Sequence, residues 1–186
     1  MTEELPEEQV LQSAIGGDSD SFSILYQRYV GRIYNYVYYR TGNAFDAEDL
    51  TARVFQRALN HIHNYQDKGV PFTAWLYRIA HNLVANWHRD NSRKKEIPIE
   101  DHLVIHSHDD HPEVSLVQNQ DTDVLLRVIR KLPPERQQLI ILKFVDRLSN
   151  AEIAHIMGKS EGAIKSLYHR TLLSLRGKLN RRSEGN

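Results

Sequence analysis

The stretch that most constrains the fold runs from Leu148 to Arg176, where a tight turn separates two helical patterns. Ser149 and Glu152 have the spacing of a capping box, which opens a helix, and Gly158 is placed to end that helix. Ser160 has a side chain suited to cap the next helix. Two short helices joined this closely predict a helix-turn-helix, which places its second helix in the major groove of DNA.

The second helix of this pair has an apolar face and a polar face at helical spacing. The expected buried residues are Ile164, Leu167, Tyr168, Thr171, Leu172 and Leu175. The expected exposed residues are Lys165, Ser166, His169 and Arg170, together with Ser160 at the start of the helix. Side chains of these types contact bases and phosphates. The alternative is an ordinary helical hairpin with a solvated charged face.

The composition limits the function classes. The chain has 186 residues, of which 40% are hydrophobic, which suits one ordinary domain or two small ones. It contains no Cys, so it cannot form a disulfide, a thiolate metal site or a cysteine nucleophile. The beginning of the chain lacks the basic and apolar pattern of a signal peptide, and no stretch is apolar enough to span a membrane. We therefore expect a soluble, cytoplasmic protein without membrane insertion.

The charges alternate in blocks, although 24 Lys and Arg balance 24 Asp and Glu over the whole chain. The net charges are −6 for residues 1–22, +5 for 23–96, −7 for 97–123 and +8 for 124–186. Two basic segments separated by acidic ones are typical of a chain in which two modules face phosphate.

The first half of the chain predicts a series of helices. One pattern begins at Glu7, is interrupted at Gly16, and resumes until Gly42. Its aromatic residues are interpreted as core packing, with a cofactor site as the alternative. The next helix begins near Ala44, and we expect its polar face either to be solvated or to dock a partner. The polar residues of this helix include Asp46, Glu48, Asp49, Arg53 and Gln56.

A third long helix is expected after Pro71. Its polar face is predicted to combine amides with guanidiniums, the groups that read base edges and hold phosphates. The residues on this face are Arg78, Asn82, Asn86, Arg89 and Arg93. Nothing in this helix resembles a catalytic pair.

The segment 97–120 is acidic and has no sustained period, so we predict a flexible linker between two domains. The linker contains His102, His106, His108 and His111 beside two aspartates, which leaves a zinc or iron site as an alternative. A mobile segment offers no rigid support for such a site. Beyond it, two helices are expected on either side of Pro133 and Pro134, the second burying Leu139, Phe144 and Val145 among others.

Five motifs in this order resemble those of the extracytoplasmic-function (ECF) sigma factors of bacterial RNA polymerase, from Glu8 to Leu179. They are Gly17-Asp18 to Tyr29, DAEDL at Asp46–Leu50, FTAWLYRIAHN at Phe72–Asn82, LPPERQ at Leu132–Gln137, and LSNAEIAHIMGKSEGAIKS at Leu148–Ser166. The resemblance implies an all-α chain with one domain over residues 1–96, a linker over 97–120 and a helix-turn-helix domain over 121–186. No enzymatic activity and no cofactor are implied, because the polymerase performs the chemistry.

The resemblance also implies a role for each set of residues. The helix with Asp46, Glu48, Asp49, Arg53 and Gln56 would dock on the clamp helices of the polymerase's largest subunit, and the C-terminal domain would reach the flap. The set formed by Asp67, Lys68, Arg78, Asn82, Asn86 and Arg89 would bind the minus-ten element and help open it. The set formed by Ser160, Lys165, Ser166, His169 and Arg170 would bind the minus-thirty-five element. An anti-sigma factor is a further candidate partner.

Two other functions remain open from the sequence. A free-standing helix-turn-helix regulator would leave the polar face after Pro71 without a purpose. A metallohydrolase would use the linker histidines, and the metal content of the purified protein tests it.

Overall fold

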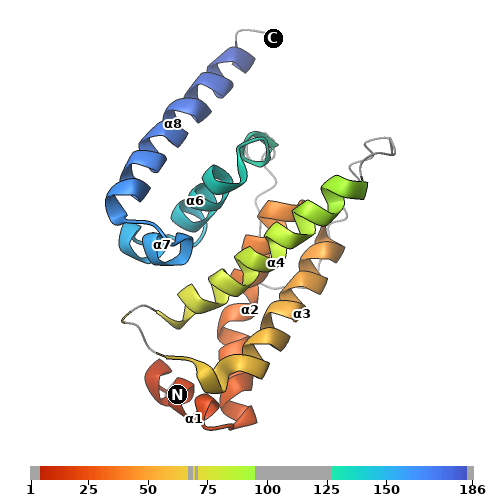
Figure 1. Cartoon of the computed structure of the whole chain (residues 1–186), viewed down its shortest axis with the longest axis vertical. Helices are drawn as coiled ribbons and strands as arrows, with labels where there is room; N and C mark the ends of the chain where they lie inside the picture. The colour runs from red at the N-terminus through yellow and green to blue at the C-terminus, as the bar shows by residue number, and fades with distance from the viewer. Residues whose placement is uncertain (1–4, 67–68, 70, 95–126, 184–186) are drawn as a thin grey trace.

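The computed structural model describes residues 5–66, 69, 71–94 and 127–183. The regular structure in these ranges is helical (Figure 1), which confirms the predicted all-α class. Residues 97–120, predicted as the linker, lie outside the described residues, and so do its histidines. None of the described helices carries an apolar stretch of the length that a bilayer crossing needs.

The N-terminal helices are α1 (Glu7–Ile15), α2 (Ser19–Thr41), α3 (Ala44–His61) and α4 (Phe72–Lys94), with a short 3-10 turn, η1 (Ile62–Asn64), after α3. Figure 1 shows α2, α3 and α4 packed along one another and α1 beside the beginning of α2. The interruption predicted at Gly16 and the end predicted at Gly42 are confirmed.

Short polar side chains set the beginnings of α2 and α3. The Asp18 carboxylate accepts a hydrogen bond from the Ser21 backbone N–H at 3.0 Å, and the Asn43 side chain accepts one from Asp46 at 3.0 Å. Such caps satisfy backbone donors that the helix leaves unpaired, at about 1 kcal/mol each. Between them, Gly42 has φ 73°, the left-handed conformation that ends α2. Nearby residues in the sequence therefore determine where α2 begins and ends and where α3 begins.

The core of the N-terminal helices is rich in aromatic residues. Tyr36 of α2 and Tyr77 of α4 are fully buried, with ring centroids 5.2 Å apart in an edge-to-face arrangement. Phe72 lies against Tyr29 and Trp75 at centroid distances of 5.8 and 5.5 Å. These contacts agree with the interpretation of the aromatic residues as core packing.

The C-terminal helices are α6 (Pro134–Phe144), α7 (Asn150–Met157) and α8 (Glu161–Ser183), preceded by a helical turn at residues 127–130. The predicted capping box is present: Ser149 Oγ accepts from the Glu152 N–H at 3.2 Å, and Glu152 Oε2 accepts from the Ser149 N–H at 2.7 Å. Gly158 ends α7 with φ 64°, and Ser160 Oγ caps α8 through the Ala163 N–H at 3.2 Å. The helix-turn-helix geometry is therefore as predicted.

Three expected core residues are exposed instead. Phe144, Val145 and Leu172 have exposed fractions of 56%, 39% and 38%. The prediction was wrong for Phe144 and Val145 because α6 ends at Phe144, and the chain reverses at Arg147, whose φ is 54°. It was wrong for Leu172 because the buried stripe of α8 runs through Thr171 and Leu175, with Leu172 at its edge. The turns of α6 before Phe144 therefore contribute to the core, where Leu139 and Leu142 are completely buried.

The two groups of helices pack against each other. Helix α6 contacts α2, and α7 contacts α4. We call this the closed arrangement.

Candidate nucleic-acid interface

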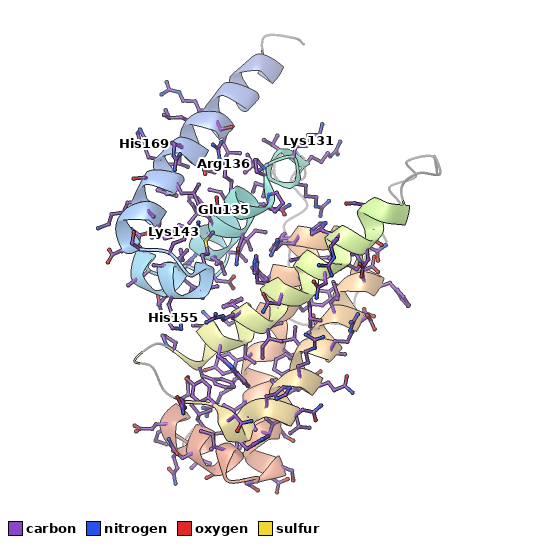
Figure 2. The ribbon with its side chains drawn as sticks, in the orientation of Figure 1. Lys131, Glu135, Arg136, Lys143, His155 and His169 are labelled. Carbon is purple, nitrogen blue, oxygen red and sulfur yellow. The ribbon has the colours of Figure 1, made fainter. Side chains whose placement is uncertain are left out.

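The polar face of α8 is open to solvent. Lys165, Ser166, His169 and Arg170 are all exposed, and Figure 2 shows His169 on the outer side of α8. Two of these side chains make exposed contacts within α8. Lys165 Nζ lies 3.1 Å from Glu161 Oε1, and Arg170 Nε donates to the Ser166 carbonyl at 3.3 Å. Exposed ion pairs of this kind are worth little, so these side chains can exchange their partners for phosphates or bases. Ser160 is exposed as well, although its hydroxyl is used as a cap.

The predicted polar face of α4 is also on the surface. Arg78, Asn82, Asn86 and Arg89 are exposed and follow one side of the helix, while Leu83 and Val84 are buried behind them. The helix that carries this row also contacts α7. Asp67 and Lys68, predicted to belong to the same site, lie outside the described residues, and so does the side chain of Arg93.

The predicted docking face of α3 is exposed too, apart from the half-buried Asp46. Glu48, Asp49, Arg53 and Gln56 face solvent, and Arg53 Nη1 lies 3.6 Å from Asp49 Oδ2. The sequence reasoning missed two apolar residues on this face.

Phe45 is 79% exposed and Leu59 is 51% exposed. At helical spacing they align with Asp49, Ala52 and Gln56, so the face has large apolar groups among polar ones. That composition is typical of a protein-binding surface. The sequence did contain a signal for their exposure, because Phe45 and Leu59 are apolar but fall outside the buried stripe of the helix.

A polar cluster between the two groups of helices was not predicted. Arg40 of α2 is only 2% exposed. Its Nη1 donates to Tyr36 Oη at 2.8 Å and lies 3.1 Å from Nδ1 of His81. Burial, and then the charge of Arg40, lower the pKa of His81 to about 4, so the ring is neutral near pH 7 and accepts the guanidinium hydrogen. The sequence did contain a signal for the burial of Arg40, because this residue follows Tyr36 by one helical turn and so lies on the buried stripe of α2.

The C-terminal helices face this cluster with Gln138 of α6 and Asp146, which follows α6. They are 2% and 6% exposed. Burial raises the pKa of Asp146 to about 6, against the opposing effects of the Tyr77 hydroxyl and of Arg32. Asp146 is hydrogen-bonded to the Tyr77 hydroxyl and Gln138 to the Tyr36 hydroxyl, whereas Arg40 Nε has no partner among the described residues.

A cleft of about 380 Å³ opens beside this cluster. The lining residues from the N-terminal helices are Arg40, His81, Ala85 and His88, and those from the C-terminal helices and their turns are Pro134, Glu135, Gln138, Met157 and Lys159. Lys159 Nζ lies 2.6 Å from Glu135 Oε1. The cleft is therefore shared by the two groups of helices.

The described part of the chain contains no group of three His, Cys, Asp or Glu side chains placed to hold a metal ion. The linker histidines lie outside that part, so the metal-site alternative stays open.

Comparisons with known proteins divide the chain in the same way as the two groups of helices. Residues 25–94 match the family model described as Sigma-70 region 2, and residues 122–175 match the one described as Sigma-70, region 4. The chain is 38% identical over 167 residues to the ECF RNA polymerase sigma factor BldN of Streptomyces coelicolor, a match over 90% of this chain and 63% of that protein. It thus spans less than two thirds of the length of BldN.

A second relative matches over nearly its whole length. The chain is 33% identical over 175 residues to the ECF RNA polymerase sigma factor SigW of Bacillus subtilis, a match over 88% of this chain and 91% of SigW. The fold resembles that of the sigma factor RpoE from Bartonella quintana, solved in complex with the anti-sigma factor NepR. That comparison has a TM-score of 0.68 at 21% identity, over 86% of this chain and 96% of the other.

Proposed function

This chain belongs to the ECF RNA polymerase sigma factors, and from that premise we propose that it directs core RNA polymerase to specific promoters and helps to open the minus-ten region. The supporting observation is that both matched regions present an exposed row of polar side chains on one helix, α4 in the first and α8 in the second. A protein that reads two separated DNA elements needs two such rows.

We assign the parts of the chain accordingly. Residues 1–96 form the domain that docks on the polymerase and binds the minus-ten element, residues 97–120 are the linker, and residues 121–186 bind the minus-thirty-five element. The docking face on α3 contacts the clamp helices of the largest subunit, and the C-terminal domain reaches the flap. Phe45 and Leu59 are well placed to be the apolar anchors of this docking face, with the polar residues Glu48, Asp49, Arg53 and Gln56 around them.

The two DNA contacts differ in kind. On α8, the exposed Lys165, Ser166, His169 and Arg170 are suited to a major groove, with Ser160 at the helix start near phosphate. On α4, the amides of Asn82 and Asn86 between Arg78 and Arg89 are suited to bases of an opened strand, whose edges are accessible. Asp67 and Lys68 belong to this second set by the sequence alone.

The proposal makes the protein a binding subunit that works in the cytoplasm without enzymatic activity or cofactor. An anti-sigma factor is a further proposed partner, because RpoE, whose fold this chain shares, was solved with one.

Reconstitution with core polymerase tests the proposed function. Purified chain and core enzyme should form a complex that transcribes from a specific set of promoters, identified by sequencing the transcripts. A chain that binds a DNA operator but neither associates with core polymerase nor supports transcription would instead be a free-standing regulator. Stoichiometric bound zinc or iron in active protein would favour the metallohydrolase alternative.

A further inference from the structure

We propose that the cleft between the two groups of helices binds a small oxyanion, a carboxylate or a phosphate, and that this ligand holds the chain in the closed arrangement. Binding itself is independent of promoter recognition. The consequence for polymerase rests on the proposed function.

The first reason is a buried cation without a counter-ion. Arg40 is 2% exposed, and no carboxylate of the described residues forms an ion pair with it. Its contacts are the Tyr36 hydroxyl and the neutral His81 ring, while its Nε remains unpaired. A buried guanidinium is stabilised only when an anion or several acceptors surround it. An anion in the adjoining cleft, which Arg40 lines, would supply the missing negative charge.

The second reason is that other hydrogen-bond donors line the same cleft. Gln138, also 2% exposed, lines the cleft as well, and its side chain is hydrogen-bonded to the Tyr36 hydroxyl. Because Arg40 donates to Nδ1 of the neutral His81, the ring hydrogen lies on Nε2. Lys159 adds an ammonium, one third exposed, and the single acid of the lining, Glu135, is already paired with it. The cleft thus combines a guanidinium, an imidazole N–H and an ammonium, which suit the charge and the acceptors of an oxyanion.

The size of the cleft selects the class of ligand. A volume of about 380 Å³ lies at the lower end of the range for small-molecule sites, so it suits a small organic acid or phosphate ester. Apolar Ala85, Pro134 and Met157 supply walls for the carbon part of such a ligand.

The ligand would act by population shift. Arg40 and His81 belong to α2 and α4, whereas Lys159 lies in the turn between α7 and α8, so the complete donor set exists only when the two groups are in contact. A ligand with such a preference stabilises the closed arrangement in proportion to its occupancy. At a concentration about 100 times the dissociation constant, the ratio of closed to open chain rises about 100-fold. Closure would compete with a polymerase that needs the domains apart.

Binding is tested by NMR on the full chain labelled with ¹⁵N, using inorganic phosphate and malonate in separate titrations. Sodium chloride keeps the ionic strength constant. The expected result is a saturable shift of the Arg40 Nε–H resonance with at least one anion, and the tighter anion identifies the class of ligand. A resonance that moves with neither anion, or equally with chloride alone, would overturn the proposal.

Two lysine variants locate the site. Lys159→Gln should weaken anion binding about tenfold or more, because a hydrogen bond to a charged donor is lost. The matched control is Lys165→Gln, which removes a lysine that is also paired with a glutamate but lies on the exposed face of α8. If Lys165→Gln weakens binding and Lys159→Gln does not, the anion sits on the DNA-binding face and the proposal fails. Neither variant removes a buried side chain, so both are expected to fold.

The effect on polymerase is a separate measurement. The anion should slow association of the unmodified chain with core polymerase and slow that of Lys159→Gln much less. Equal slowing of both would overturn the regulatory part. A chain that never binds polymerase would contradict the proposed function instead, leaving the NMR result unaffected.

Discussion

At the scale of single residues, Lys165 and Arg170 are the strongest candidates for contacts to the minus-thirty-five element. Replacing either with Ala should weaken holoenzyme binding to that element by about 1–3 kcal/mol if the side chain reads a base. A phosphate contact would instead lower affinity on all sequences alike and flatten the salt dependence. Binding assays at several salt concentrations distinguish the two. The exposed Lys131 provides a control, and unchanged binding in both test variants would show that another face of α8 meets the DNA.

Asn82 and Asn86 are predicted to contribute to strand opening. The double variant Asn82→Ala, Asn86→Ala should assemble with core polymerase and bind the minus-thirty-five element normally, because neither residue is buried. It should open the minus-ten region poorly, since unstacking costs a few kcal/mol that contacts to the opened strand must offset. Permanganate reactivity of the minus-ten thymines measures opening. A pre-melted template should restore transcription at least in part, and normal opening would contradict the assignment.

At the scale of elements, the turn between α7 and α8 depends on Gly158. Its φ is 64°, and a Cβ added there would meet nothing within 4 Å, so Gly158→Ala tests backbone conformation alone. We expect a loss of about 1–2 kcal/mol in the free energy of unfolding, the cost of a left-handed conformation for a residue with a Cβ. Gly162 is the matched control, because it is helical and equally open. Gly162→Ala should stabilise the chain by up to about 1 kcal/mol. Urea unfolding compares them, and equal effects would contradict the prediction.

The contact between the groups of helices contains two titrating residues with opposite effects. Burial raises the pKa of Asp146 from 3.8 to about 6, so its contribution to closure is present at low pH and is lost as pH rises towards 6. Burial and Arg40 lower the pKa of His81 from 6.5 to about 4, so its contribution is present above pH 6.5 and is lost as pH falls towards 4. Between pH 4 and 6 the two changes oppose each other.

The variant Asp146→Asn should therefore make closure pH-dependent. It removes the contribution that grows on acidification and leaves that of His81, so the closed fraction should fall between pH 6.5 and 4 more steeply than in the unmodified chain. Since the chain lacks Cys, dyes at Asn60→Cys and Leu173→Cys, exposed positions on α3 and α8, report the separation by energy transfer. Identical pH profiles would show that Asp146 does not contribute to the contact.

For the whole molecule, the closed arrangement brings the helix groups that carry the two polar rows into contact, whereas the proposed function needs the rows far apart. Duplex DNA rises about 3.4 Å per base pair, so elements about 25 base pairs apart are separated by roughly 85 Å. In the closed arrangement the two groups of helices are in direct contact. The contact buries the polar side chains of Arg40, Gln138 and Asp146, and the cost of taking them out of water offsets part of the gain from burial, so it should open readily when a partner binds each group.

Free protein should accordingly bind a duplex promoter much more weakly than the holoenzyme does at the same salt concentration. Polymerase would hold the groups apart and make the second DNA contact effectively intramolecular, while the acidic segments screen the basic ones in the free chain. Electrophoretic mobility or anisotropy with one promoter fragment measures both affinities. Equal values would favour a free-standing regulator.

The sequence by itself determined the helices, their ends and the exposed polar rows of α4 and α8. These features depend on local physics: a Ser or Asp caps the helix that follows it, Gly42 and Gly158 adopt conformations that other residues avoid, and a period of 3.6 separates buried from exposed positions. This is why the capping box at Ser149 and the face containing Lys165 could be predicted from spacing alone.

Only the tertiary structure decided how the two groups of helices meet. The same period that predicted the core could not show that Arg40 is buried against His81, or that Gln138 and Asp146 close over them, because these contacts join residues about 40 to 110 positions apart. Phe144 was placed in the core by its apolar character, yet the chain turns away there and leaves it exposed. Burial of a side chain near a helix end depends on what packs against that end, which local sequence does not encode.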